Sequence, residues 1–146
     1  MRPALIVTSH GNMAEETVNS AKMIVGDIDN IHIISMMADD GLSKTTEKFS
    51  IVLNQLDKTS QIVVLADLKG GTPCNVAMMK MSDYPNMQVI TGFNLAMLLE
   101  SIFTQATTSI ELVEQLLDAG KSAINIIELP TLMSSDDDDD DDIELD

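Results

Sequence analysis

Two polar residues follow short apolar segments of the sequence, and their side chains have complementary chemistry. His10 comes shortly after the segment 4–7, and Asp67 comes directly after the segment 61–66. Neither segment alternates strictly with polar residues, which predicts strands buried on both faces of a sheet. In an open α/β sheet the ligand crevice lies beyond the carboxyl ends of the strands. In a doubly wound sheet these strands can be neighbours, which would bring the imidazole and the carboxylate together.

Such a pair has the chemistry of an activated nucleophile. A carboxylate that accepts a hydrogen bond from one ring nitrogen fixes the tautomer of a histidine. The other ring nitrogen then keeps its lone pair toward solvent, where it can attack a substrate. Directly after Asp67, the run 70–73 (Gly-Gly-Thr-Pro) opens a predicted helix, whose free N–H groups and dipole favour an anion. A nucleophilic imidazole facing such an anion site is the arrangement that a phosphohistidine needs.

Each of these features also has a purely structural interpretation. A single histidine at a strand end is more often structural than catalytic, an aspartate can simply cap a turn, and the glycines can form only a tight turn. Because all three occur at two strand ends on the same predicted edge of the sheet, their combination favours a functional site.

The rest of the sequence predicts the elements that must position this site. Apolar segments predict strands, helical spacing of apolar residues predicts helices, and the two kinds of element alternate with short connections. The strands are predicted over 4–7, 31–36, 61–66, 87–91 and 123–129, and the helices, caps included, over 12–25, 42–56, 72–81, 94–103 and 108–120. This order predicts one α/β domain, a doubly wound three-layer sandwich with a mostly parallel central sheet.

Four of the predicted helices begin at residues that favour a helix N-cap. These residues are Asn12, Thr72, Asn94 and Thr108. Pro73 then occupies the first position of its helix, where the missing N–H costs nothing. The last strand, 123–129, follows its helix so closely that an antiparallel edge position is as consistent with the sequence as a parallel one.

The charge of the chain is unevenly distributed. The formal net charge is −16, but nine of the 24 acidic residues lie in the segment 134–146. The remainder carries a net charge of −7, which argues against nucleic-acid binding because that function needs a basic face. The residues 131–146 are predicted to be a disordered acidic tail after a domain over 1–130.

Other features of the composition exclude several further classes of protein. Cys74 is the only cysteine, so an intramolecular disulfide or a cysteine metal cluster is excluded. The sequence contains no signal-peptide pattern and no apolar run of the ~20 residues that span a bilayer. We therefore expect a cytoplasmic protein, an expectation compatible with peripheral association with a membrane complex.

Three blocks of the sequence together resemble one protein family. They cover residues 6–11 (Ile-Val-Thr-Ser-His-Gly), residues 63–75 and residues 91–98. The His-Gly pair and the Asp-x-x-Gly-Gly-Thr-Pro-x-Asn pattern, at this spacing, are similar to the IIA component of the mannose-type sugar phosphotransferase system. The resemblance extends over about residues 3–129, and members of that family are bacterial phosphoryl carriers.

The resemblance implies a phosphotransferase with a phosphohistidine intermediate. His10 would receive a phosphoryl group on Nε2 from the histidine phosphocarrier protein, while Asp67 orients the ring through Nδ1. The group would pass to a separate IIB subunit and then, indirectly, to sugar at the membrane IIC/IID complex. No metal or organic cofactor is required. The expected phosphate-binding residues are Gly11, Gly70, Gly71 and Thr72, and the expected partner rim is Leu68 and Lys69.

The resemblance also implies a homodimer in which the strand 123–129 is exchanged and lies antiparallel on the partner's sheet edge. One departure from the family is Lys69, a position where many members carry an aromatic residue. Because a flexible cation changes the rim that partners touch, this departure bears on partner identity.

Two other functions remain open from the sequence. One is the phosphotransfer subunit of a dihydroxyacetone kinase, whose first domain shares the fold and the histidine but typically lacks the Gly-Gly-Thr-Pro pattern. The other is a non-catalytic regulatory module that binds a small anion or a partner protein. A flavodoxin-like nucleotide binder ranks third, because no Gly-x-Gly-x-x-Gly pattern follows the first predicted strand.

Overall fold

The apolar segments of the sequence form four strands of one sheet, and a helix follows each of them. The computed structural model describes residues 1–131. The strands are β1 (Ala4–His10), β2 (Ile31–Met36), β3 (Ile62–Ala66) and β4 (Met87–Thr91), and the helices are α1 (Met13–Val25), α2 (Gly41–Leu53), α3 (Thr72–Lys80), α4 (Leu95–Phe103) and α5 (Ser109–Ser122). The sheet order is β2-β1-β3-β4, and every pairing is parallel.

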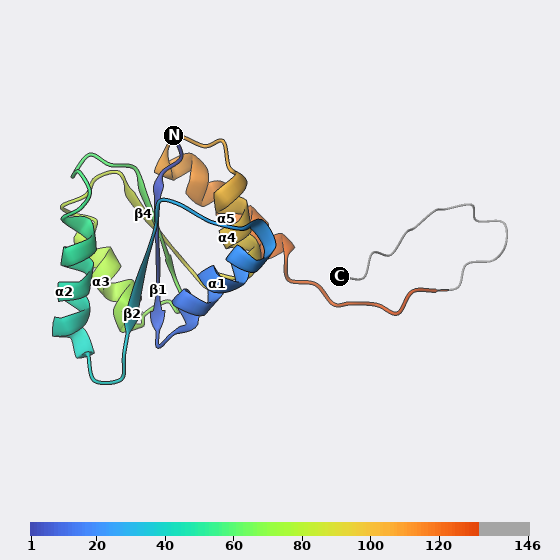
Figure 1. Cartoon of the computed structure of the whole chain (residues 1–146), viewed down its shortest axis with the longest axis horizontal. Helices are drawn as coiled ribbons and strands as arrows, with labels where there is room; N and C mark the ends of the chain where they lie inside the picture. Colours follow the sequence, from blue (N-terminus) through green and yellow to red (C-terminus); the bar gives the residue numbers. More distant parts are fainter. Residues whose placement is uncertain (132–146) are drawn as a thin grey trace.

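Helices cover both faces of this sheet, as Figure 1 shows. Along β1, Leu5 and Val7 pack into the core under α1, α4 and α5, while Ala4 and Ile6 pack into the core under α2 and α3. This alternation follows from the two-residue repeat of a strand. Both cores are apolar, which explains why the central strands lack an alternating polar pattern. The predicted three-layer α/β sandwich is confirmed.

The register of the central strands brings two chain segments to one edge of the sheet. Thr8 of β1 lies opposite Ala66, the last residue of β3. The strand β1 continues for two further residues along β2, ending with His10 opposite Met36. The predicted strand 4–7 was therefore too short. As a consequence, His10 projects past the end of β3, next to the residue that follows it, Asp67.

Two of the predicted helix caps are confirmed. The side chain of Asn94 accepts a hydrogen bond from the N–H of Met97 at 3.0 Å, and the side chain of Thr108 accepts one from the N–H of Glu111 at 3.2 Å. Both capping residues have the extended backbone that an N-cap requires. These bonds fix the starts of α4 and α5.

Of the other two predicted caps, Asn12 is confirmed in position only and Thr72 is wrong. Asn12 is the N-cap residue of α1, and its carbonyl accepts the N–H of Glu16 at 2.9 Å, but its backbone (φ −94°, ψ 10°) is not extended and its side chain makes no capping bond. Thr72 is already the first residue of α3, and the extended residue before it is Gly71. The remaining helix boundaries differ from the predicted ones by up to three residues; for example, α2 ends at Leu53.

The predicted strand 123–129 is not part of the sheet of this chain. Ala123 is the C-cap of α5, and residues 124–131 form no ladder with the four strands and leave the body of the molecule (Figure 1). A strand needs the backbone groups of a neighbouring strand. Along this path the chain offers none, so residues 124–131 form no strand within the single chain, and the exchange of this segment with a second copy stays a prediction. The predicted acidic tail lies, from residue 132 on, outside the described residues.

Candidate active site

The imidazole of His10 lies against the carboxylate of Asp67. The Nδ1 atom of His10 is 2.8 Å from Oδ2 of Asp67, and the backbone N–H of His10 donates to the same oxygen at 3.0 Å. Because a carboxylate only accepts, Nδ1 carries the proton and Nε2 keeps its lone pair. The side chain of Asp67 is 10% exposed, whereas that of His10 is 43% exposed. The ring is thus anchored on its buried side.

The turn between β1 and α1 is fixed by a buried serine. The Oγ atom of Ser9 accepts the N–H of Ala14 at 2.8 Å and donates to the carbonyl of Gly11 at 3.2 Å. Gly11 has φ +58°, and its amide donates to the carbonyl of Met36 at 2.8 Å. The Gly11 amide is therefore engaged in shaping the turn. Sequence reasoning missed Ser9, whose only signal is a hydroxyl shortly before a helix start.

The connection between β3 and α3 is a tight turn that touches the imidazole. The N–H of Gly71 donates to the carbonyl of Leu68 at 3.2 Å, and Gly70 has φ +83°. A glycine with positive φ at the third position is typical of a type II turn. A methyl group at Gly71 would lie 2.6 Å from Cε1 and 3.2 Å from Nε2 of His10. Glycine is therefore needed here to leave room for the ring.

The first turn of α3 offers unused backbone donors beside Nε2. Gly71 caps this helix, so the amides of Thr72 and Cys74 have no acceptor within the helix, and Pro73 has no N–H to satisfy. The positive end of the helix dipole lies at the same place. Of the four predicted phosphate-binding residues, the structure thus brings Gly71 against the ring of His10, with Gly70 and Thr72 as its neighbours in the chain.

The surface at this edge of the sheet is open and partly apolar. Both predicted rim residues, Leu68 and Lys69, are exposed. Exposed apolar side chains also follow β1 and β2 at this edge: Met13 begins α1, Met37 follows β2 and Leu42 lies in the first turn of α2. An exposed patch of this kind is typical of a protein-docking surface. Sequence reasoning did not single out these three residues.

The loop between β2 and α2 is held in place by Asp40. Its Oδ2 accepts the N–H of Met37 at 2.7 Å and pairs with Nζ of Lys48, which also donates to the carbonyl of Ser35 at 2.8 Å. The hydrogen bond from Lys48, followed by that from Met37, holds the pKa of Asp40 below its usual value. This loop follows Met36, whose carbonyl binds the turn after His10. The ion pair therefore stabilises the surroundings of the site.

Two hollows of the surface lie away from the imidazole of His10. One of about 420 Å³ surrounds Arg2 and Asp29 at the opposite end of the strands, and another of about 420 Å³ lies between β2 and α2. Neither is lined by His10 or Asp67. The candidate nucleophile is thus presented on an open surface, which suits a large partner better than an enclosed small molecule.

The sequence matches one family over most of its length. Residues 4–119 match the EIIA-man family, described as the PTS system fructose IIA component. The chain belongs to this family of IIA components of the sugar phosphotransferase system. Of the residues that the structure describes, none lies in a helix long and apolar enough to cross a membrane.

Individual relatives agree with this assignment. A mannose/sorbose-specific IIA subunit from Enterococcus faecalis is 48% identical with a TM-score of 0.87, covering 91% of this chain and 100% of that one. A PTS IIA protein associated with the fucose utilization operon of Streptococcus pneumoniae is 30% identical with a TM-score of 0.74, covering 86% and 93%. The mannose-specific EIIAB component of Escherichia coli K12 is 28% identical over 130 residues, which are 88% of this chain but 40% of that protein.

Proposed function

We propose that this protein carries a phosphoryl group on Nε2 of His10 between two proteins of a sugar phosphotransferase system. The donor is the histidine phosphocarrier protein, and the acceptor is a IIB subunit, which passes the group on toward the membrane IIC/IID complex. The observation that carries the proposal is the contact of 2.8 Å between Nδ1 of His10 and Oδ2 of Asp67. This contact leaves Nε2 as the free nucleophile on an open surface.

The transfer step follows from this geometry. The lone pair of Nε2 forms a bond to phosphorus, while the bond from phosphorus to the donor nitrogen breaks and its electrons return to the donor. The proton on Nδ1 stays in place. The ring then carries positive charge, because both of its nitrogens are substituted, and the carboxylate of Asp67 stabilises that charge. Positioning and charge stabilisation are the main requirements of phosphoryl transfer.

The start of α3 offers backbone hydrogen-bond donors to the oxygens of the phosphoryl group. The free amides of Thr72 and Cys74 and the helix dipole favour the negative charge of the phosphoryl group. The family match favours this function over the subunit of a dihydroxyacetone kinase. A binding module without chemistry would not need the ring to be held in one tautomer.

We further propose that the protein is a homodimer that exchanges the segment 123–129. Ile124, Ile126, Ile127 and Leu129 are 78–93% exposed, a large apolar surface for four neighbouring residues. Within residues 1–131 the strand β4 has one unpaired edge, and a hollow of about 190 Å³ beside it is lined by Ile90, Leu117 and Ile124. An antiparallel strand from a second copy would pair with this edge and cover the apolar side chains.

The test of the carrier function is a labelling assay with radioactive phosphoenolpyruvate, enzyme I and the histidine phosphocarrier protein. The wild type should take up about one acid-labile phosphoryl group per chain. The variant His10→Ala should take up none, because the nucleophile is missing. The matched control is His32→Ala, which removes the only other histidine and should leave labelling intact. Label that persists on His10→Ala would contradict the proposal.

The role of Asp67 is tested separately by Asp67→Asn. The fold should persist, but transfer should slow by roughly 10–100-fold, because an amide neither fixes the tautomer nor stabilises the charged ring. Rapid-quench experiments measure the labelling rates of the wild type and of Asp67→Asn. Circular dichroism checks that the variant is folded. Labelling at the wild-type rate would rule out the orienting role of this carboxylate.

A further inference from the structure

Lys69 is the only basic residue in the connections that follow the four strands. In the described part of the chain, these connections are residues 11–12, 37–40, 67–71 and 92–94. Their ionisable side chains are Asp39, Asp40, Asp67 and Lys69. Three carboxylates and one ammonium group therefore lie on the edge of the sheet where the proposed phosphoryl group arrives.

The negative charges at this edge are only partly compensated. Asp40 pairs with Lys48, but Asp67 pairs only with His10, and its Oδ1 atom is buried without a hydrogen-bond donor within residues 1–131. Lys69 is exposed, and it takes no part in the ion pairs of the same residues. Its ammonium group is thus available to a new anion.

The turn between β3 and α3 places Lys69 close to Nε2 of His10. Lys69 occupies the second position of the turn that the bond from Gly71 to Leu68 closes. Since two residues span at most about 7 Å, its Cα lies within about 7 Å of the Cα of Gly71. A methyl group on Gly71 would in turn lie 3.2 Å from Nε2. The flexible four-carbon stem of lysine covers a gap of this size.

We infer that the ammonium group of Lys69 binds the phosphoryl group on Nε2 and stabilises the phosphorylated form of this protein. The inference rests on the proposed carrier function. A phosphoryl group brings close to two negative charges, and the helix amides offer only partial positive charges against them. Lysine supplies the missing full charge as a compact donor, which is its usual way of binding phosphate. Lys69 is thus a phosphoryl-binding residue, and not only part of the rim that partners touch.

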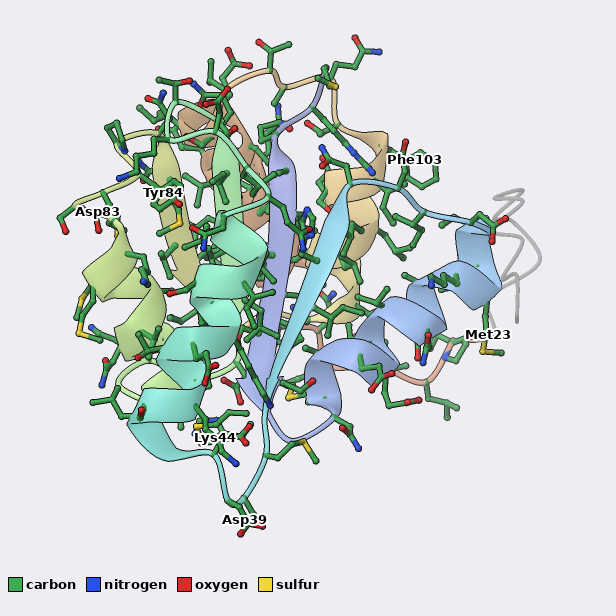
Figure 2. All side chains as sticks on the ribbon, turned by 60° about the vertical axis from the view of Figure 1, so that its left-hand side comes forward. Met23, Asp39, Lys44, Asp83, Tyr84 and Phe103 are labelled. Atoms are coloured by element: carbon green, nitrogen blue, oxygen red, sulfur yellow. The ribbon has the colours of Figure 1, made fainter. Side chains whose placement is uncertain are left out.

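One equilibrium separates binding of the phosphoryl group from contact with a partner. The distribution of phosphoryl groups between the phosphocarrier protein and this protein depends on the free species alone, so docking cannot change it. We would measure this equilibrium constant for full-length wild type, Lys69→Met and Lys69→Arg. The matched control is Lys44→Met, which removes the same charge from an exposed site; Figure 2 shows Lys44 near the start of α2, at the end of the molecule toward which β1 runs.

The expected result is a shift of the equilibrium toward the phosphocarrier protein by about three- to tenfold in Lys69→Met at low salt. Lys69→Arg should restore most of the wild-type value, and Lys44→Met should stay within about twofold of it. The shift should shrink as salt screens the ammonium group. The isolated phosphorylated Lys69→Met protein should also have an altered rate of hydrolysis without any partner present.

An equilibrium constant that Lys69→Met leaves unchanged would overturn the inference, even if labelling became slower, because Lys69 would then act only in docking. Equal shifts in Lys69→Met and Lys44→Met would also overturn it, since net charge alone would explain both. Failure of the proposed function has a different signature. In that case the wild type itself would take up no label, and the inference would fail with it.

Discussion

The ring of His10 is fixed by two contacts of different kinds. Asp67 binds one nitrogen through a hydrogen bond of 2.8 Å, and Gly71 lies against the far side of the ring, where no side chain would fit. The first contact decides which nitrogen is free. The second decides where that nitrogen points relative to the start of α3. Both contacts are therefore needed if the proposed nucleophile is to face the proposed anion site.

The variant Gly71→Ala tests the second contact. The added methyl group would push the imidazole away from Asp67, and phosphorylation should slow by roughly 100-fold, as a misplacement of about 1 Å does elsewhere. Stability should change by less than about 1 kcal/mol, because Gly71 has φ −74°, which alanine adopts readily. The measurements are labelling rate and urea unfolding.

The neighbouring glycine provides the contrast. Gly70 has φ +83° and open space around its Cα, so Gly70→Ala should cost roughly 1–2 kcal/mol of stability without pushing on the ring. Wild-type labelling by Gly71→Ala would show that the ring is not confined as described.

For single residues, the sequence was informative where a chemically reactive side chain lies at the end of a strand. His10 and Asp67 could be predicted because each follows an apolar segment that must be a strand. The contact between Gly71 and the ring depends on how closely two connections approach, which no local pattern records. For the same reason the engagement of the Gly11 amide by Met36 could not be foreseen.

At the scale of elements, the start of α1 depends on Ser9 instead of Asn12. Ser9→Ala should lower the free energy of unfolding by about 1–2 kcal/mol, because it leaves the buried N–H of Ala14 without its acceptor. Asn12→Ala should stay within about 0.5 kcal/mol of the wild type, since Asn12 makes no capping bond. Urea unfolding of both variants measures the difference. A larger loss in Asn12→Ala than in Ser9→Ala would reverse this assignment.

The two predicted caps whose side chains make no capping bond, Asn12 and Thr72, share a physical cause. Several polar residues near a helix start fit the sequence pattern of a cap equally well. The backbone conformation at the end of the preceding strand determines which of their side chains reaches the free N–H groups of the helix. Here β1 extends to His10, so the hydroxyl of Ser9 points back to α1 across the turn. At α3 the extended residue is Gly71, and Thr72 is already helical.

The loop between β2 and α2 should respond to acid through Asp40. Lys48 and the N–H of Met37 lower the pKa of Asp40 in the folded protein, so its ionised form stabilises the fold above the unfolded pKa of about 3.9. This contribution is lost as pH falls through the lowered pKa of the folded state. The stability difference between wild type and Asp40→Asn should thus be largest above about pH 5 and vanish in stronger acid. Urea unfolding from pH 7 to pH 3 measures it; a difference that grows toward low pH would contradict the assigned sign.

At the scale of the whole molecule, the exposed apolar segment after α5 should hold two copies together. In the full chain, the double variant Ile126→Glu/Ile127→Glu should sediment as a monomer, because two carboxylates cannot be buried between strands without partners. The matched control removes residues 134–146 and should remain a dimer. Sedimentation velocity distinguishes the two species. A dimeric double variant would show that the contact between copies lies elsewhere.

The sequence of this segment predicts a strand, and the single chain does not form one. An apolar run such as 123–129 satisfies every local requirement for a strand, yet a ladder needs a second backbone beside it. Local sequence cannot say which copy of the chain supplies that backbone. The four strands that find partners within the chain could be predicted, because a helix follows each of them and the helices α1, α2 and α3 return the chain to the sheet.

The commitment of Nδ1 to Asp67 has a kinetic consequence for the proposed carrier. Phosphorylation of Nε2 and transfer of the phosphoryl group away from it both occur at this one nitrogen, which is reached from one side. The two partner proteins therefore compete for the same docking surface. Each is then a competitive inhibitor of the other's reaction. The overall rate of phosphoryl transfer then passes through a maximum as the concentration of either partner rises. The ratio of the two partners in the cell therefore determines this rate.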